Sequence, residues 1–141
     1  MGKITLSNEE MQKIRIASDV TKVDVVDCVE TEDKIIFVLK KGFIIFALGR
    51  NARNVDTLRK FFKKNVRFVE LDDDEEKFIV NLFKPFKIDS ITIEKVGKRN
   101  VAKVEVNPRD KSKVIGKNGR NINAIRELAK RHSSVDDVQI L

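Results

Sequence analysis

The sequence contains very little of what catalysis, metal binding or membrane insertion usually requires. Its one cysteine, Cys28, excludes an internal disulfide and a cysteine-based zinc cluster. Its one histidine, His132, is distant from that cysteine in the sequence, so no nucleophile–base set is recognisable. No apolar run approaches the roughly 18 residues of a membrane span. We therefore expect no catalytic residue, no metal, no cofactor, no small-molecule substrate and no membrane partner.

Two sequence signals of other protein classes are also missing. No Gly-x-x-x-x-Gly-Lys-Ser/Thr run occurs, which argues against a nucleotide hydrolase. Residues Met1–Thr5 do not lead into the apolar segment that a signal peptide contains. We expect the protein to remain in the cytoplasm.

What the sequence does contain is an excess of positive charge, with 29 Lys and Arg residues against 22 Asp and Glu. The charge is concentrated. Residues 49–64 hold six basic residues and one acidic residue, and residues 109–131 hold eight and two. The remainder of the chain is net negative. A basic segment is often only a solvated helix face, but two such segments favour a polyanionic partner such as nucleic acid.

The two basic segments belong to an internal repeat. Gly49–Arg59 aligns without gaps on Gly116–Arg126, and the glycine, both asparagines and two arginines of each segment coincide. The offset of 67 residues indicates one unit of about 70 residues used twice. We place the two domains at residues 1–72 and 73–141. No Gly/Ser-rich or Pro-rich spacer separates them, which favours a rigid pair.

Hydrophobic periodicity and turn residues predict the same order of elements in each unit, helix–strand–strand–helix–loop–helix–strand. The fold class is therefore α+β, with a three-stranded sheet packed against helices in each unit. In the first unit we expect a helix after Ser7 or Asn8, strands at 22–30, 34–39 and 66–69, and a helix from Asn54. The run 43–48 stays unassigned. In the second we expect a helix from Asp74 to Pro85, strands at 88–96, 101–106 and 135–140, and helices at 108–115 and from Asn121.

Six phenylalanines lie in apolar runs, where core packing is the more common role and stacking on bases the less common one. We expect the core to contain all six: Phe37, Phe43, Phe46, Phe61, Phe62 and Phe68.

The most informative motif is Val114–Gly119, a Gly-x-x-Gly turn between two predicted helices. Glycines at its corners allow a tight turn and the close approach of a phosphate. The helix that follows directs free N–H groups and the positive end of its dipole toward that phosphate. Lys113, Lys117 and Arg120 add positive charge nearby. The loop is suited to holding a nucleic-acid backbone.

This motif and its context resemble the KH family of RNA-binding modules. A helix and a strand that precede the β-α-α-β core are similar to the type II arrangement, and two adjacent type II modules resemble the archaeal NusA-like transcription elongation and termination factors. The resemblance implies binding of single-stranded RNA, the nascent transcript, and RNA polymerase as a protein partner. It implies two sets of RNA-binding residues: Gly116, Lys117, Asn118, Gly119, Arg120 and Lys113 in the second module, and Gly49, Arg50, Asn51 and Arg53 in the first.

The first loop departs from the family pattern because Ala52 occupies the place of the second glycine. If that position requires a left-handed backbone, alanine costs roughly 1–2 kcal/mol or forces another conformation. Two alternative functions stay open: a ribosome-associated or ribosome-assembly KH protein that binds rRNA, and a protein-interaction adaptor that uses KH surfaces.

Overall fold

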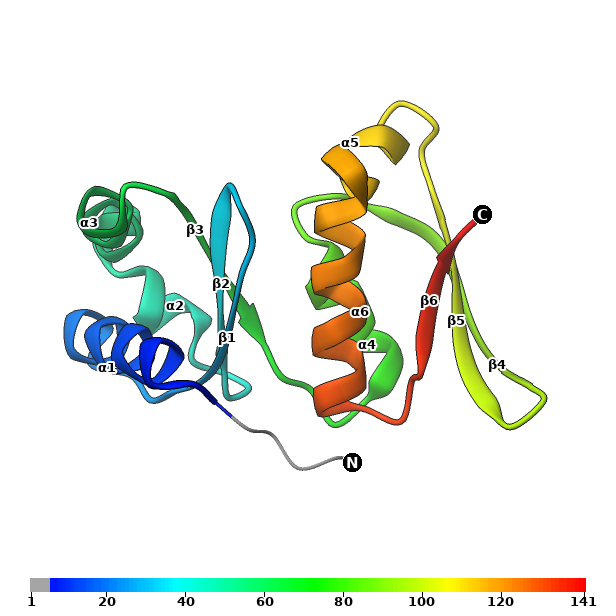
Figure 1. Cartoon of the computed structure of the whole chain (residues 1–141), viewed down its shortest axis with the longest axis horizontal. Coiled ribbons are helices and arrows are strands. Elements are labelled where there is room, and N and C mark those ends of the chain that lie inside the picture. Colours follow the sequence, from blue (N-terminus) through cyan, green and yellow to red (C-terminus); the bar gives the residue numbers. More distant parts are fainter. Residues whose placement is uncertain (1–5) are drawn as a thin grey trace. The chain divides into compact units, whose positions relative to one another are not determined.

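The order helix, strand, strand, short helix, helix, strand occurs twice along the part of the chain that the computed structural model describes, residues 6–141. The chain divides into two units, one ending at Asp72 and one running from Asp73 to Leu141 (Figure 1). The expectation about a signal peptide depended on residues 1–5, which lie outside the described residues. No helix in the described part of the chain is long and apolar enough to span a membrane.

The first unit holds three strands and three α-helices. Their bounds are α1 Asn8–Thr21, β1 Val25–Glu30, β2 Lys34–Leu39, α2 Ile44–Leu48, α3 Arg53–Phe62 and β3 Asn65–Glu70. The start of α1 is fixed by a reciprocal cap, because the Ser7 hydroxyl accepts from the Glu10 N–H and the Glu10 carboxylate accepts from the Ser7 N–H. Lys22 ends the helix in the left-handed conformation, at φ 61°.

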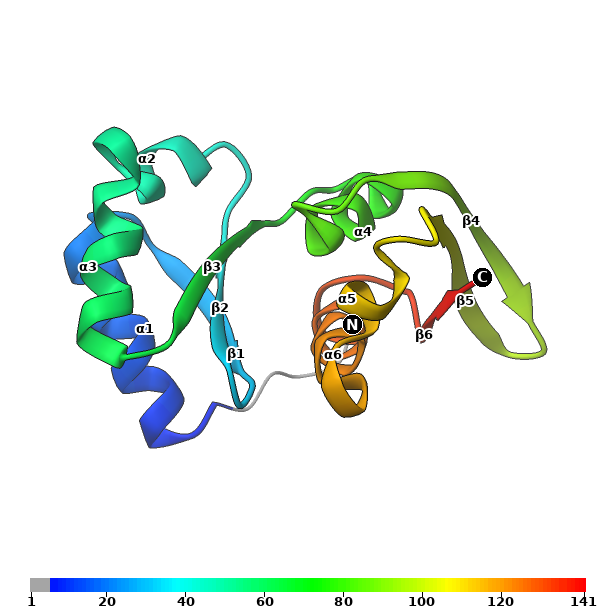
Figure 2. The same ribbon diagram turned by 90° about the horizontal axis from the view of Figure 1, so that it is seen from above.

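The sheet of the first unit has the order β1-β2-β3, with β2 antiparallel to β1 and parallel to β3. Alternate residues of the central strand, Ile35, Phe37 and Leu39, are fully buried in one core cluster with Ala17 of α1 and Leu58 of α3. Helices α1 and α3 lie on the same side of the sheet (Figure 2). Both helices therefore cover the face toward which these alternate residues point.

The second unit repeats this arrangement. Its elements are α4 Glu75–Phe83, β4 Ile88–Val96, β5 Arg99–Val106, α5 Lys111–Ile115, α6 Arg120–His132 and β6 Asp137–Ile140. The sheet order is β4-β5-β6, with β5 antiparallel to β4 and parallel to β6. The apolar residues that recur at helical spacing along α6 are all buried: Ile122, Ile125, Leu128 and Ala129. The expected α+β fold of two tandem type II KH modules is confirmed.

Several boundaries differ from those expected by one to three residues. Strand β1 begins at Val25 because the left-handed Lys22 ends α1 first. Strand β6 begins at Asp137, two residues late, and β5 begins two residues early, at Arg99. The unassigned apolar run after Gly42 is the short helix α2.

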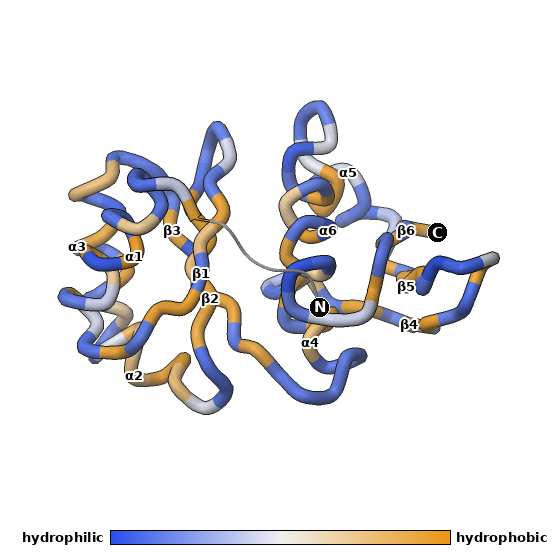
Figure 3. The backbone as a smooth tube through the Cα atoms, turned by 60° about the horizontal axis from the view of Figure 1, so that its bottom comes forward, coloured by the Kyte–Doolittle hydropathy of each residue, from blue (hydrophilic) through white to orange (hydrophobic). Residues whose placement is uncertain are grey.

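The prediction that all six phenylalanines belong to the core is wrong for three of them. Phe37 and Phe68 are buried and Phe62 is partly buried, but Phe43, Phe46 and Phe61 are 43, 66 and 62% exposed. The reason for the first two is the shortness of α2. This helix is apolar throughout (Figure 3). A helix of little more than one turn can bury only one side in the core, and here that side is the one around Ala47.

Candidate nucleic-acid interface

The second loop is a tight turn between α5 and α6. Gly116 ends α5 with φ 79° and ψ 166°, and the turn Lys117–Gly119 closes with a 3.0 Å hydrogen bond from the Gly119 N–H to the Gly116 carbonyl. Asn118 and Gly119 both have left-handed backbones, at φ 57° and 73°. Glycine adopts such angles at no steric cost and asparagine tolerates them, so the residue types match the backbone.

The first loop has the same backbone despite its alanine. Gly49 has φ 74° and ψ 177°, Asn51 has φ 54°, and the Ala52 N–H donates to the Gly49 carbonyl at 3.2 Å. Ala52 itself has φ 56° and ψ 29°. The alternative in which alanine forces another conformation is therefore wrong. The loop keeps its shape, and Ala52 carries the steric cost of a left-handed alanine.

An asparagine at the start of the following helix holds each loop. The Asn121 amide donates to the Val114 carbonyl at 2.7 Å, and the Asn54 amide donates to the Ala47 carbonyl at 3.1 Å. The two bonds are equivalent in the repeat, because Asn121 follows Asn54 by 67 residues and Val114 follows Ala47 by the same offset. Each bond ties the short helix before the loop to the helix after it. Asn54 and Asn121 are identical in the two copies of the repeat, which was the signal in the sequence that both have a structural role.

The two glycine positions of the loop differ in the space around them. A Cβ added at Gly116 would lie 2.9 Å from the Asn121 backbone nitrogen, which is closer than carbon atoms approach. At Gly49 it would lie 2.7 Å from the Asn54 amide nitrogen. A Cβ at Gly119 would meet its nearest atom, Asn123 Nδ2, at an ordinary 3.5 Å. The second glycine can thus be replaced by alanine at the cost of backbone strain only, which is the change that Ala52 represents.

Both loops lead into a helix whose first N–H groups face the turn. Within the described residues, neither the start of α3 at Arg53 nor the start of α6 at Arg120 has a side-chain cap. The first N–H of each helix donates to the turn, from Arg53 to the Arg50 carbonyl and from Arg120 to the Lys117 carbonyl. The positive end of the helix dipole favours an anion at this place. In α6 this end belongs to a helix of 13 residues.

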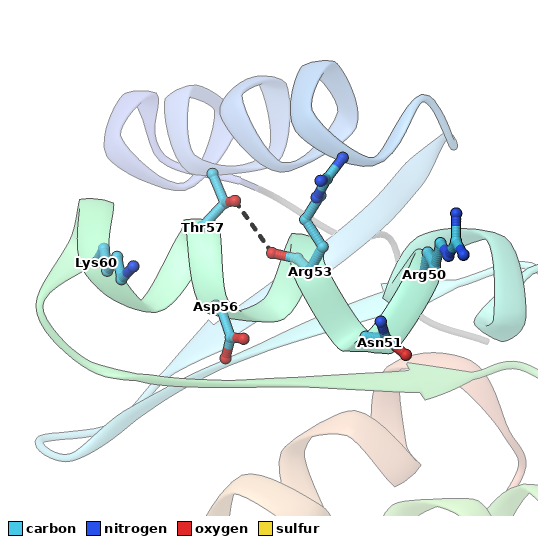
Figure 4. A pocket seen from close by; sticks show the side chains of 6 residues that line it. All are labelled: Arg50, Asn51, Arg53, Asp56, Thr57 and Lys60. Carbon is cyan, nitrogen blue, oxygen red and sulfur yellow. Dashed lines mark hydrogen bonds between the residues drawn. The ribbon is translucent and has the colours of Figure 1, made fainter.

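Basic side chains surround the first loop. A cleft of about 520 Å³ is lined by residues of the loop and one face of α3, drawn in Figure 4: Arg50, Asn51, Arg53, Asp56, Thr57 and Lys60. The Thr57 hydroxyl donates to the Arg53 carbonyl at 3.0 Å. Asp56 is the single acidic side chain of the lining, and it lies 3.9 Å from Arg59. The lining is therefore cationic overall and suited to a phosphate-bearing ligand.

The expected site residues fall into two groups, one in each unit. Gly49, Arg50, Asn51 and Arg53 are contiguous at the first loop. At the second loop, Lys113 is exposed on α5, Lys117 and Asn118 form the turn, and Arg120 opens α6. One of the cations in the basic segments, Arg126, is bonded within the fold. Its guanidinium ties α6 to β6, through the Val138 carbonyl at 2.9 Å and Asp137 at 3.2 Å.

Residues that carry other chemistry are placed elsewhere. Cys28 is fully buried in the core of the first unit. His132 ends α6, with its ring edge-on to Phe78 at 6.2 Å between centroids. Within the described residues, no group of three or more His, Cys, Asp or Glu side chains is arranged to hold a metal ion.

The fold and the paired loops define a tandem type II KH protein, and comparison with known proteins agrees. Residues 75–138 match the model of the NusA-like second KH domain. A protein of Methanocaldococcus jannaschii described as "Probable transcription termination protein NusA" is 33% identical over 100% of this chain and 77% of its own length. A Halobacterium salinarum protein of the same description is 33% identical over 97% of this chain and 98% of its own length.

A solved structure gives the same result. The crystal structure of APE1850 superposes with a TM-score of 0.75 at 30% identity, covering 96% of this chain and 100% of that one. The chain belongs to the archaeal NusA-like family of tandem KH-domain proteins. The resemblance stated from the sequence is thus confirmed.

Proposed function

We propose that this protein binds single-stranded RNA through its two KH loops and thereby modulates transcription elongation or termination. The observation that carries the proposal is the matching left-handed backbone of the two loops, each of which leads into a helix that has no side-chain cap. Membership of a NusA-like KH family supports it, because KH modules clamp about four nucleotides at such a loop. The role is one of binding, and we assign no catalytic residue.

In the Gly116–Gly119 turn, we propose that the backbone N–H groups of Lys117 and Asn118 and the ammonium group of Lys117 hold phosphates, because the Gly116 and Gly119 N–H groups donate to the Ser112 and Gly116 carbonyls. Lys113 and Arg120 add charge on either side, and Asn118 supplies an amide at the turn. At the first loop, Arg50, Asn51 and Arg53 take the corresponding places around Gly49. The mechanism leaves the bases free, because a loop that grips phosphates carries no sequence information by itself.

The test is fluorescence anisotropy with a short unstructured RNA at several salt concentrations. We expect a Lys117→Asp, Asn118→Asp variant to bind at least tenfold more weakly and to show a smaller salt slope, because each lost phosphate contact reduces counterion release. The matched change in the first unit is Arg50→Asp, Asn51→Asp. A control with the same charge change away from both loops is Lys98→Asp, Lys95→Gln, in the turn and strand of the β4–β5 hairpin. If both loop variants stay folded and bind like the control, the loops do not clamp RNA.

We further propose RNA polymerase as the protein partner and the cytoplasm as the place of action, since the relatives are described as transcription termination proteins. Affinity purification of the intact protein from cells tests this. Recovery of polymerase subunits supports the proposal. Recovery of ribosomal subunits in their place would contradict it and favour an rRNA-binding role.

A further inference from the structure

The short helix that precedes the loop differs in chemistry between the two units. In the first unit, α2 exposes Ile45 and Phe46 at 77 and 66% of their surfaces, and Phe43 just before it is 43% exposed. The repeat offset places Asp110, Ser112 and Lys113 at the corresponding positions of the second unit. The same structural place thus presents polar and charged groups in one module and bare apolar side chains in the other.

Phe46 lies in α2, three residues before Gly49, the first residue of the first loop. The Gly49 N–H donates to the Ile45 carbonyl at 3.2 Å, so the helical turn continues as far as Gly49. Residues three apart on a helix share one face, so Phe46 and Gly49 lie on the same face of this turn. Phe43 is an aromatic neighbour, with its ring centroid 6.3 Å from that of Phe46 at an interplanar angle of 51°.

We propose that Phe46, supported by Phe43, is a stacking platform for a base of the RNA strand whose phosphates the Gly49–Ala52 loop holds. The inference rests on the proposed function and assigns a different chemistry to each module. The second module grips RNA mainly by charge, with Lys113 and Lys117. The first combines the cations Arg50 and Arg53 with an aromatic surface.

Nucleic acid is favoured over a protein partner because of what adjoins the exposed rings. The cationic cleft of Arg50, Arg53 and Lys60 begins at the same loop, and the backbone there has the same left-handed turn as the Gly-x-x-Gly loop of the second unit. Single-strand binding sites combine a positive groove with aromatic side chains on which successive bases stack. A base attached to a phosphate at Gly49 would leave solvent and cover a ring that is otherwise two-thirds exposed.

The first test compares Phe46→Ala with Phe46→Tyr in the intact protein, using a short unstructured RNA. Stacking on one base corresponds to a loss of about 5- to 150-fold in affinity on truncation to alanine, and tyrosine retains most of the affinity. The salt slope should stay unchanged, since no charge is removed, whereas Arg50→Asp, Asn51→Asp reduces it. Phe61→Ala is the matched control, because Phe61 is equally exposed at the far end of α3.

The second test uses the absence of tryptophan from the sequence. Phe46→Trp introduces a single fluorophore at the platform, and a base stacked on it should quench the emission in proportion to the RNA bound. Phe61→Trp should show little quenching.

The outcomes separate the two proposals. If Phe46→Ala binds RNA like the wild type and Phe46→Trp is not quenched, while the Lys117→Asp, Asn118→Asp variant loses binding, the platform is wrong and RNA binding stands. The exposed α2 face would then be a protein-docking surface. If the wild type itself does not bind RNA, both proposals are wrong.

Discussion

At the residue scale, the two loops show which positions require glycine and which only prefer it. The first glycine is needed in both loops because the asparagine that holds the loop occupies the space of a Cβ. The second glycine is required only by its backbone angle, and no atom opposes a methyl group there. Alanine is therefore tolerated at position 52. It lowers the free energy of unfolding but leaves the shape of the first loop unchanged.

We expect Ala52→Gly to stabilise the first unit. Relief of the left-handed alanine contributes roughly 1–2 kcal/mol, and the greater freedom of glycine in the unfolded chain offsets roughly 0.4–1 kcal/mol. The net gain in the free energy of unfolding is then about 0.5–1 kcal/mol. Urea denaturation measures it. The converse change, Gly119→Ala, should lower stability by a similar amount, and equal stabilities for all three proteins would show that the left-handed alanine costs nothing here.

At the element scale, one carboxylate connects three segments of the first unit. Glu30, at the end of β1, accepts from the ammonium groups of Lys13 on α1 at 2.5 Å and of Lys64, just before β3, at 2.7 Å. The hydrogen bond from Lys13, followed by that from Lys64, lowers the pKa of Glu30. The same contact raises the pKa of Lys13. The Glu30 carboxylate is one-third exposed, so solvent screening limits the benefit.

We expect Glu30→Gln to lower the free energy of unfolding by less than about 1 kcal/mol at pH 7. Because the folded pKa of Glu30 is depressed, its contribution is complete above the unfolded pKa of about 4.3 and is lost as the pH falls through the folded value. The stabilities of wild type and variant should therefore begin to converge as the pH falls below about 4.3. Denaturant titrations from pH 3 to 8 test this.

The matched control for Glu30→Gln is Asp19→Asn, which removes an exposed carboxylate of α1. It should not destabilise the protein at pH 7. A difference between wild type and Glu30→Gln that persists unchanged at pH 3 would mean that packing, and not the ion pairs, is responsible.

At the scale of the whole molecule, each unit has its own sheet and its own buried side chains. The core cluster of the first unit is formed entirely by residues 17–68. In the second unit, Phe78 and Leu82 of α4 and Ile125 and Leu128 of α6 are fully buried. Domains of this size bury about 60% of their unfolded surface and can fold alone.

We expect a fragment of residues 73–141 to fold cooperatively and to bind RNA more weakly than the intact chain, with a smaller salt slope because fewer phosphates are contacted. Circular dichroism during urea denaturation and anisotropy measure the two properties. In the intact chain, labelling of the buried Cys28 thiol reports unfolding of the first unit separately. A fragment that stays unfolded under conditions where the intact protein is native would contradict the independence of the units.

The amino-acid sequence by itself determined the repeat, the order of elements and the position of the second loop. These features are readable because they depend on local properties: hydrophobic period, turn residues and the clustering of charge. The buried face of α6 followed from its 3.6-residue pattern. The cap at Ser7 and the end of the second unit's first helix near Pro85 followed from the preferences of single residues.

Only the tertiary structure decided the features that depend on which surfaces meet. Ala52 has a left-handed backbone because the loop must close between two helices that the Asn54 hydrogen bond holds together. The intrinsic preference of alanine is for a right-handed or extended backbone. The Arg126 side chain bonds to β6 because the Val138 carbonyl lies within its reach. Phe46 is exposed because no other element of the described chain covers it. Composition and periodicity record how apolar or charged a segment is. They do not record whether another part of the chain is present to cover it.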